Sequence, residues 1–437
     1  MAHRLVRWGW RWAVAVLVWG MLAGGSALAI AGRVQATGRG GRLVVADTVA
    51  ARLYVYSLPD LGLLATFENL RLDLHSGTLP LADGRLLLVD AQAGEFVVLG
   101  AGWSGSPAVA VRVRIPTPTA WSAVDPGLRY FVASSFRRAA RETAAIVDMA
   151  SLSVHEVVFD LKGNDELHPL LGGNPLTLYA SVTGELYAYP LADVLVNRAT
   201  GPASTARIGA GTHGPVIAHG LGKVALTTRA GLEVVDIAGP KLGPHRVLPW
   251  DASGRSGGQN FRPRLAYDGR RVYGAVYPPL PAERWAERQN DVHVADLKDG
   301  TVRRIALAAG IVPRFAISEV YALFFHVHPA GDAAYLLDVR PESETFQRIV
   351  ARIPLPPLEA SPPVAGESPA GRGSRSGAIT PDGRWAFVSH GGDGRVSVID
   401  TSVRRIVRVL TVPTPLRGGG YMVAWQPGIR LVDTVGR

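Results

Sequence analysis

The chain has 437 residues, with 50 glycines, 31 prolines and no cysteine, and its formal net charge is +10. The absence of cysteine excludes disulfides, thiolate metal sites and covalently attached c-type haem. The basic residues, mostly arginine, are scattered along the chain and form no basic stripe, so no nucleic-acid partner is expected. Plentiful turn formers together with 47% hydrophobic residues predict short strands joined by tight turns.

Residues 1–29 are predicted to be a signal peptide. Three arginines precede an apolar run over 12–22, and the triplet Ala-Leu-Ala at 27–29 fits the small-x-small rule for cleavage. An uncleaved N-terminal anchor is the alternative, because the apolar stretch approaches the length of a membrane span. We therefore expect a periplasmic or secreted protein, with a flexible lead-in over 30–40 and no stable membrane insertion once the leader is removed.

Residues 41–437 are predicted to form a single all-β domain built from repeats. The clearest repeat covers 377–410, where four apolar segments are separated by turn residues such as Pro381-Asp382-Gly383. Similar turns recur along the chain, most of them about 43 to 63 residues apart, which is in or near the range of propeller blades. Because one four-stranded sheet cannot bury both of its faces, stacking such sheets around an axis predicts a β-propeller.

We expect about eight four-stranded blades. The first repeat begins at Leu43–Ala46 and lacks an innermost strand, whereas Tyr421–Trp425 is an extra strand near the other end of the sequence. Pairing of these N- and C-terminal strands would close the ring through one composite blade. Seven blades are the alternative, because the repeat near 333–376 is degraded by an insertion rich in Pro, Gly and Ser at Pro354–Ser376.

Two residue types recur with the repeats and are assigned structural roles. Tryptophans such as Trp121 are spread through the repeats, so packing in the core or between blades is expected. Aspartates recur at strand ends, where a carboxylate caps the following turn. These aspartates are Asp47, Asp90, Asp148, Asp236, Asp296, Asp338 and Asp400.

The segment from Trp385 to Thr401, with the strand Arg405–Val412 that follows, resembles the repeat of the YVTN-type and cytochrome d1-type propellers. The match is specific for one blade, and the other repeats agree with it in strand order and turns. Propellers of this group are mostly extracytoplasmic, so the resemblance implies export, in agreement with the leader.

Histidines recur before the first turn of several repeats, where the innermost strands of a propeller converge. His75 and His213 each lie nine residues before a turn glycine, and His168 and His326 each lie six residues before a turn. Neutral imidazoles converging at about 2.0–2.1 Å from one point would form a zinc site, completed by a carboxylate. The predicted ligands are His75, His168, His213, His326 and His328, with Asp73, Asp165 or Glu166 as the carboxylate.

Two other interpretations of these histidines remain open. They could be structural residues that seal the mouth of the channel with water, or they could hold an anionic or tetrapyrrole ligand. His390 is interpreted as a turn residue on the same face but farther from the axis.

The placement of the histidines is similar to that in periplasmic zinc chaperones that accompany ABC-type zinc importers. This resemblance implies zinc as the bound metal and the solute-binding protein of a metal transporter as the partner. Those chaperones carry a His-rich N-terminal segment, and 32–40 contains no histidine here.

The sequence therefore predicts an exported binding protein, expected to be a monomer, with zinc as its one possible cofactor. It contains no nucleophile elbow, phosphate loop, dinucleotide fingerprint or His-Glu-x-x-His helix, so an enzyme is not expected. One alternative is a scaffold that binds other proteins through the loops Pro278–Asn290 and Pro354–Ser376. Another is the large subunit of a quinoprotein-type dehydrogenase that has no cofactor of its own.

Overall fold

The structure is a computed structural model that describes most of the chain from Gly40 to Gly436. The residues outside the description are 1–39, 73–76, 101–102, 104, 116–118, 136–140, 161–165, 183, 252–262, 359–374 and 437. The predicted signal peptide and three of the predicted site residues, Asp73, His75 and Asp165, therefore lie outside the described residues.

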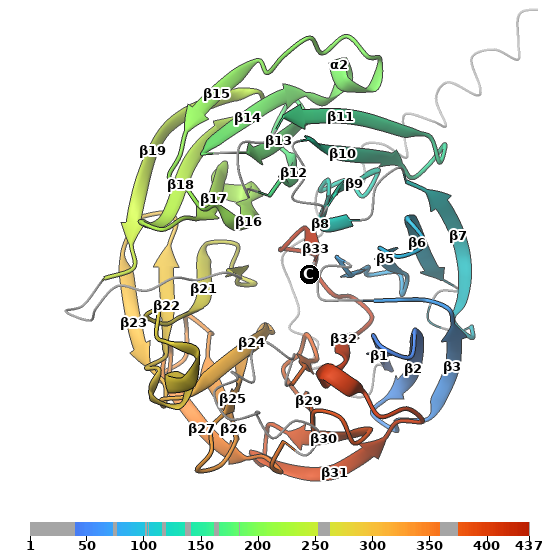
Figure 1. Ribbon diagram of the computed structural model, residues 1–437, viewed down its shortest axis with the longest axis vertical. Helices are drawn as coiled ribbons and strands as arrows, with labels where there is room; N and C mark the ends of the chain where they lie inside the picture. Colours follow the sequence, from blue (N-terminus) through green and yellow to red (C-terminus); the bar gives the residue numbers. More distant parts are fainter. Residues whose placement is uncertain are drawn as a thin grey trace, which may run out of the picture. The chain divides into compact units, whose positions relative to one another are not determined.

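The described chain forms eight antiparallel sheets arranged in a ring, so the predicted eight-bladed propeller is confirmed (Figure 1). From the innermost strand outward, blade 1 contains β32 (Tyr421–Trp425), β1 (Gly41–Asp47), β2 (Arg52–Leu58) and β3 (Leu63–Glu68). Blade 2 contains β4 (Leu79–Pro80), β5 (Leu86–Asp90), β6 (Glu95–Gly100) and β7 (Ala108–Arg114). Blade 3 contains β8 (Thr119–Val124), β9 (Tyr130–Ser135), β10 (Arg141–Asp148) and β11 (Val154–Asp160). Blade 4 contains β12 (His168–Gly172), β13 (Thr177–Val182), β14 (Glu185–Pro190) and β15 (Ser204–Arg207).

The second half of the ring follows the same order. Blade 5 contains β16 (His213–Ala218), β17 (Lys223–Thr227), β18 (Gly231–Ala238) and β19 (Lys241–Pro249). Blade 6 contains β20 (Arg264–Leu265), β21 (Arg271–Val276), β22 (Asp291–Asp296) and β23 (Val302–Ala306). Blade 7 contains β24 (Ile311–Ile317), β25 (Tyr321–Val327), β26 (Ala333–Asp338) and β27 (Ile349–Pro354). Blade 8 contains β28 (Gly377–Ile379), β29 (Trp385–Ser389), β30 (Arg395–Asp400) and β31 (Arg405–Thr411).

In the part of the chain that the structure describes, helical structure is limited to short connections. These are α2 (Leu191–Leu195) and the 3-10 turns η1 (His219–Leu221), η2 (Ala282–Glu287) and η4 (Arg417–Gly419). Across the described residues, no helix is long and apolar enough to cross a membrane.

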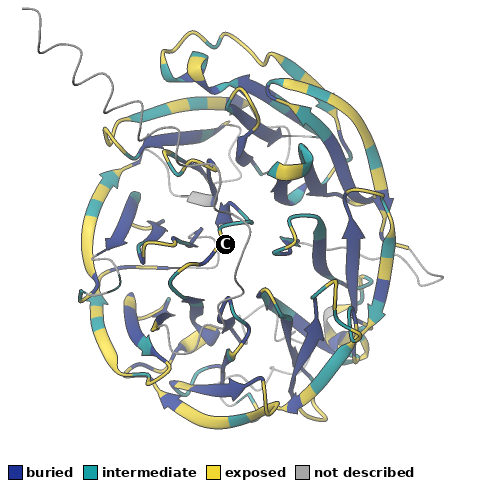
Figure 2. Ribbon diagram, turned by 180° about the vertical axis from the view of Figure 1, so that it is seen from behind, coloured by how far each residue is buried: buried dark blue, intermediate teal, exposed yellow. Residues whose placement is uncertain are grey.

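The core consists of apolar layers between neighbouring blades. Inner strands such as β1 and β22 are buried along their whole length, whereas the outermost strands β3 and β7 are largely exposed (Figure 2). One cluster joins Leu43 of blade 1 to Phe387 of blade 8, and another joins Val44 to Leu86 of blade 2. Both faces of the blade 1 sheet are thus covered by neighbours, which explains why its inner strands are continuously apolar instead of alternating.

The ring closes as predicted, through pairing of β32 with β1, in which Val423 lies opposite Val44. A second pairing was not predicted. The two-residue strand β33 (Val435–Gly436) adds to the inner side of β8 and makes blade 3 five-stranded. Two residues carry no recognisable strand pattern, so this contact was invisible in the sequence.

The turn at 330–332 follows the second strand of blade 7 and not the first, so the predicted alignment of this repeat is wrong by one strand. The first turn of this blade, Ser318-Glu319-Val320, contains neither glycine nor proline and therefore gave no turn signal. Blade 7 is a full four-stranded blade over Ile311–Pro354, and the insertion lies after it.

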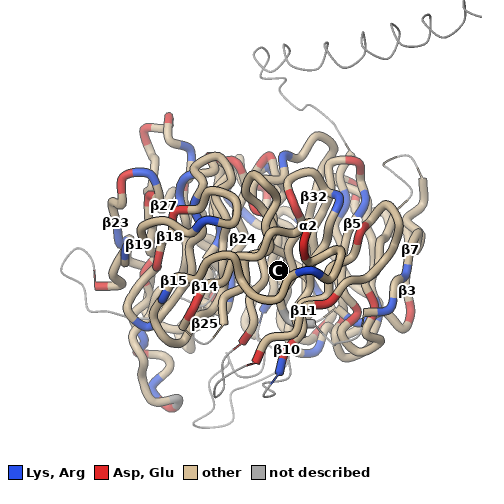
Figure 3. Tube along the Cα trace, turned by 90° about the horizontal axis from the view of Figure 1, so that it is seen from above, with Lys and Arg blue, Asp and Glu red and all other residues tan. Residues whose placement is uncertain are grey.

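The predicted capping by aspartates is present at the strand ends. The Oδ1 atom of Asp47 accepts hydrogen bonds from the backbone N–H groups of Val49 and Ala50, and Asp90 and Asp148 make the same pair of bonds to their own turns. In four blades a basic side chain in, or directly after, the turn that precedes the second strand also pairs with the aspartate. These pairs are Arg129–Asp148, Lys223–Asp236, Arg270–Asp296 and Arg384–Asp400. Acidic and basic residues are interspersed in the side view of the ring (Figure 3).

Asp338 shows how strongly such a carboxylate can be held. Its side chain is fully buried and accepts hydrogen bonds from Ser343 Oγ at 2.7 Å, Thr345 Oγ1 at 2.6 Å and Arg340 at 2.6 Å. Burial alone would raise the pKa of Asp338, but these donors outweigh it and lower the pKa to about 2.

We expect Asp338→Asn to lower the free energy of unfolding by about 1–2 kcal/mol at pH 7. Because the folded-state pKa is depressed, this stabilisation is present above the usual aspartate pKa and is lost as the pH falls toward 2. Urea unfolding of both proteins between pH 7 and pH 2 measures the difference, with the exposed Asp60→Asn as a control. A difference that stays constant over this range would contradict the assignment.

Candidate metal centre

Three side chains from neighbouring blades meet at the face of the ring where the innermost strands begin, here called the upper face. Glu166 lies two residues before β12, His168 is the first residue of β12, and His213 is the first residue of β16. Because β12 and β16 are the innermost strands of adjacent blades, their first residues lie close together near the axis (Figure 1).

Two of the three distances between the donor atoms are close to those of a tetrahedral metal site. Glu166 Oε2 lies 3.3 Å from His213 Nδ1 and 3.6 Å from His168 Nε2, and one potential ligand atom of each residue lies within 4.8 Å of the others. Metal–ligand bonds of about 2.0–2.1 Å at tetrahedral angles separate neighbouring ligand atoms by roughly 3.3–3.4 Å. The two separations from Glu166 Oε2 are thus close to those of a tetrahedral site, and the third, between the two imidazoles, is at most 4.8 Å.

A tryptophan completes the wall of this site. The indole N–H of Trp121, on β8 of blade 3, donates a hydrogen bond to Glu166 Oε2 at 3.1 Å. Its ring lies 4.7 Å from the ring of His168 and 4.9 Å from that of His213, between centroids. Trp121 thus orients the carboxylate and packs against both imidazoles.

Irregular backbone helps to aim two of these side chains. The register of β8 against β9 shifts between Thr119 and Ser122, and that of β16 against β17 shifts between His213 and Pro215. Each shift inserts one extra residue into the inner strand, which is a β-bulge, and bulges re-aim side chains next to functional sites. The sequence predicts only a packing role for Trp121, because a bulge has no reliable sequence signal.

The electrostatics of the site favour an ionised carboxylate. Burial would raise the pKa of Glu166, but its neighbours outweigh this effect and lower the pKa to about 2. These neighbours are His213, through a hydrogen bond and its charge, His168, through its charge, and Trp121, through a hydrogen bond. An ionised carboxylate beside two imidazoles is a donor set that suits zinc.

The backbone between the ligands is also fixed. The N–H of Leu167, between Glu166 and His168, donates to Glu142 Oε2 at 2.9 Å, and Glu142 is almost completely buried on β10. Glu142 therefore holds the segment that carries two of the three candidate ligands.

His326 and His328 were predicted at the start of an innermost strand, and this placement is wrong. His326 lies near the end of β25, the second strand of blade 7, and His328 follows that strand. The reason is the shifted alignment of this repeat. One nitrogen of each ring is engaged locally, because His326 Nε2 lies 2.5 Å from Ala309 O and His328 Nδ1 accepts the N–H of Ala330. The described residues do not bring these two histidines together with Glu166.

Other histidines also make local contacts. His390 follows β29 in the turn where it was expected, with Nε2 at 2.9 Å from Ser397 Oγ. His293 lies against Trp250 with Nε2 at 3.3 Å from Pro249 O, and burial lowers its pKa to about 4. These residues agree with the structural interpretation of individual histidines.

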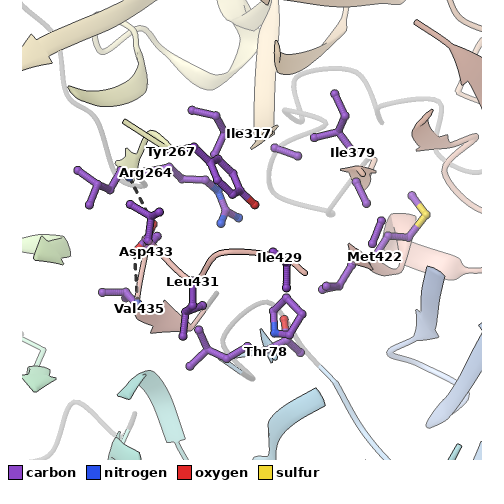
Figure 4. A pocket seen from close by; sticks show the side chains of 18 of the residues that line it. Thr78, Arg264, Tyr267, Ile317, Ile379, Met422, Ile429, Leu431, Asp433 and Val435 are labelled. Atoms are coloured by element: carbon purple, nitrogen blue, oxygen red, sulfur yellow. Dashed lines mark hydrogen bonds between the residues drawn. The ribbon is translucent and has the colours of Figure 1, made fainter. Parts of the chain in front are cut away.

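A separate cavity of about 140 Å³ lies in the channel, lined by Arg264, Tyr267, Ile317 and Met422 among others (Figure 4). The segment Ile429–Val435 contributes one wall. Clefts that hold drug-sized ligands measure roughly 300–1,000 Å³, so this cavity does not favour a tetrapyrrole. None of the three candidate metal ligands lines it.

Comparison with known proteins supports the fold. No protein-family model matches the chain, and no curated protein matches it in sequence. Two structures of AztD from Citrobacter koseri, one of them the apo form, are similar at 13% identity, with TM-scores of 0.62 and 0.65, and cover 89% of this chain and 98% of theirs. The structure of the dihydro-heme d1 dehydrogenase NirN in complex with DHE is similar at 16% identity, with a TM-score of 0.56. The match covers 89% of this chain and 75% of the NirN chain. The expected likeness to the cytochrome d1-type propellers is thus confirmed at the level of the fold.

We expect Trp121→Phe to raise the pKa of Glu166 by about one unit, because the carboxylate loses one of its hydrogen-bond donors. Carbon-13 NMR of the labelled glutamate carboxyl groups measures this shift. Trp103→Phe is the matched control, since its indole N–H donates to Ala82 O instead. The same pKa in all three proteins would show that Trp121 does not support the carboxylate.

Proposed function

We propose that this protein binds a divalent metal ion, with zinc as the first choice, at Glu166, His168 and His213. The observation that carries the proposal is the convergence of one carboxylate and two imidazoles, from two adjacent blades, at separations that fit a tetrahedral ion. His168 and His213 would bind as neutral imidazoles and Glu166 as a carboxylate, while Trp121 keeps Glu166 oriented.

A fourth ligand would come from His75 or from a water molecule. His75 precedes Gly77 by two residues, and Gly77 O accepts a hydrogen bond from Ser122 Oγ at 3.1 Å. Ser122 follows Trp121 in β8, so Gly77 contacts the strand that forms the wall of the site. Asp73 and Asp165 are the other two carboxylates expected from the sequence, and Asp165 is adjacent to Glu166.

The accessibility of the site suits transfer of a metal. The side chains of Glu166 and His213 are 13% and 20% exposed, whereas His168 is fully buried. An ion held by one buried and two partly exposed ligands can be reached by a partner without unfolding the ring. We propose a periplasmic metallochaperone whose partner is the solute-binding protein of a metal transporter. The predicted leader, the resemblance to periplasmic zinc chaperones and the fold shared with AztD support this assignment.

Zinc titration of the purified protein tests the site. We expect Glu166→Gln and His213→Ala each to weaken zinc binding roughly 100-fold or more, because each removes one ligand. His328→Ala is the matched control and is expected to bind zinc like the parent protein. Isothermal calorimetry gives the affinity, and thermal denaturation of the apo proteins shows whether each variant is folded.

Two outcomes would remove the metal assignment. One is a parent protein that takes up no zinc, and the other is equal uptake by the parent and by both ligand variants. If the parent protein binds no zinc and His213→Ala only lowers the melting temperature, the cluster is a structural ion pair.

The contribution of His75 is tested separately. We expect His75→Ala to weaken zinc binding about 10- to 100-fold, with the apo stability unchanged. X-ray absorption spectroscopy of the zinc-loaded proteins counts the imidazole ligands, and the number should fall by one in the variant. An unchanged spectrum would assign the fourth position to water or to a carboxylate.

A further inference from the structure

The segment Gln426–Gly436 is not needed to close the ring, because β32 already pairs with β1 before it begins. Since β32 runs away from the upper face, the segment starts at the opposite face, and β33 then runs back toward the upper face, because it is antiparallel to β8. Figure 1 shows β33 beside β8 in the middle of the ring. On the way it contacts several blades. Gln426 donates a hydrogen bond to Asp382, and Arg430 donates one to the carbonyl of Tyr267. Asp433 accepts a hydrogen bond from the N–H of Leu265. Thr434 contacts His219 through its hydroxyl and accepts the N–H of Val124 with its carbonyl.

The last strand of this segment is packed without spare room. Gly436 lies opposite Ser122, and a Cβ atom at position 436 would approach both Gly77 O and Ser122 Oγ to 2.3 Å. Thr434 and Val435 are almost completely buried. Position 436 therefore accepts only glycine while β33 is seated.

The seating of β33 reaches the candidate metal centre through one strand. Strand β8 pairs with β9 on its outer side, and the bulge at Trp121 interrupts that ladder. On the inner side, β33 supplies the second ladder, with Val435 opposite Ala123 and Gly436 opposite Ser122, directly after Trp121. Trp121 in turn donates to the carboxylate of Glu166.

We propose that the seating of β33 sets the metal affinity of the Glu166, His168 and His213 site, so that Gln426–Gly436 is a built-in regulator of metal release. This inference rests on the proposed metal binding. When β33 is seated, β8 is held on both sides and Trp121 orients Glu166. When β33 leaves the channel, β8 loses its inner ladder and the site is less well ordered for the ion. A partner that withdraws the segment would therefore promote release of the metal.

Coupling of this kind is reciprocal, because a ligand that prefers the seated state must also favour seating. Typical coupling between two sites changes affinity roughly 5- to 150-fold. The amide of Val124 reports on seating, since it donates to Thr434 O at 2.9 Å. Unseating of β33 is expected to weaken zinc binding by a certain factor. Because the coupling is reciprocal, bound zinc is expected to slow hydrogen exchange at the Val124 amide by a similar factor.

The test compares two variants that remove β33 with a glycine control. In Gly436→Ala the added Cβ expels the strand, and in a chain shortened to end at Asp433 the strand is absent. Gly201→Ala is the control, because a Cβ there meets nothing within 4 Å. We expect both variants to bind zinc about 10-fold more weakly than the parent and the control. Exchange at Val124 is expected to be faster in Gly436→Ala, and the melting temperature should stay close to that of the parent.

The outcomes separate the two proposals. A parent protein that binds no zinc overturns the proposed function. If the parent binds zinc and the shortened chain binds it equally well, only the regulatory role of β33 is overturned, and the metal site stands. Weaker binding by the shortened chain, without slower exchange at Val124 when zinc is added to the parent, would also overturn the coupling.

Discussion

The structure depends on one constraint, which is that each four-stranded sheet has two apolar faces and can cover neither of them alone. In a ring every sheet is covered on both sides, and the contacts between Leu43 and Phe387 and between Val44 and Leu86 are two of these layers. The outermost strands then face solvent and the innermost strands face the axis. Stacking thus fixes the positions of the candidate site residues before any of their own interactions are considered.

The candidate metal centre is a direct result of this geometry. The innermost strands of adjacent blades begin at one face, so residues that start β12 and β16 become neighbours although they are far apart in sequence. Two bulges then adjust the direction of individual side chains. Glu142 and Trp121 add the contacts that hold the carboxylate and its segment. The partly exposed carboxylate of Glu166 then lies beside two imidazoles, where an ion would be stabilised.

The sequence predicted those parts of the molecule that repeat. Patterns seen several times along the chain predict the number of blades and the closure by Tyr421–Trp425. They also predict the capping aspartates and the placement of His168 and His213. The errors concern features without repetition. The first turn of blade 7 lacks glycine, so the turn pattern points to a later turn and predicts the wrong strand for His326. The role of Trp121 depends on a bulge, and β33 has only two residues, so neither carries a pattern of its own.

The composite blade has a consequence for the order of folding. The innermost strand of blade 1 comes from residues that follow all seven other blades in the sequence, whereas its other three strands precede those blades. Until β32 arrives, blade 1 has an unpaired edge and the apolar layer that it shares with blade 8 cannot form. Such a late long-range contact slows folding, and it leaves apolar surface and an unpaired strand edge exposed for longer, which favours aggregation. Blade 1, the first blade to begin in the sequence, is therefore the last that can be completed, and the stability of the whole ring depends on a contact between segments separated by all the other blades.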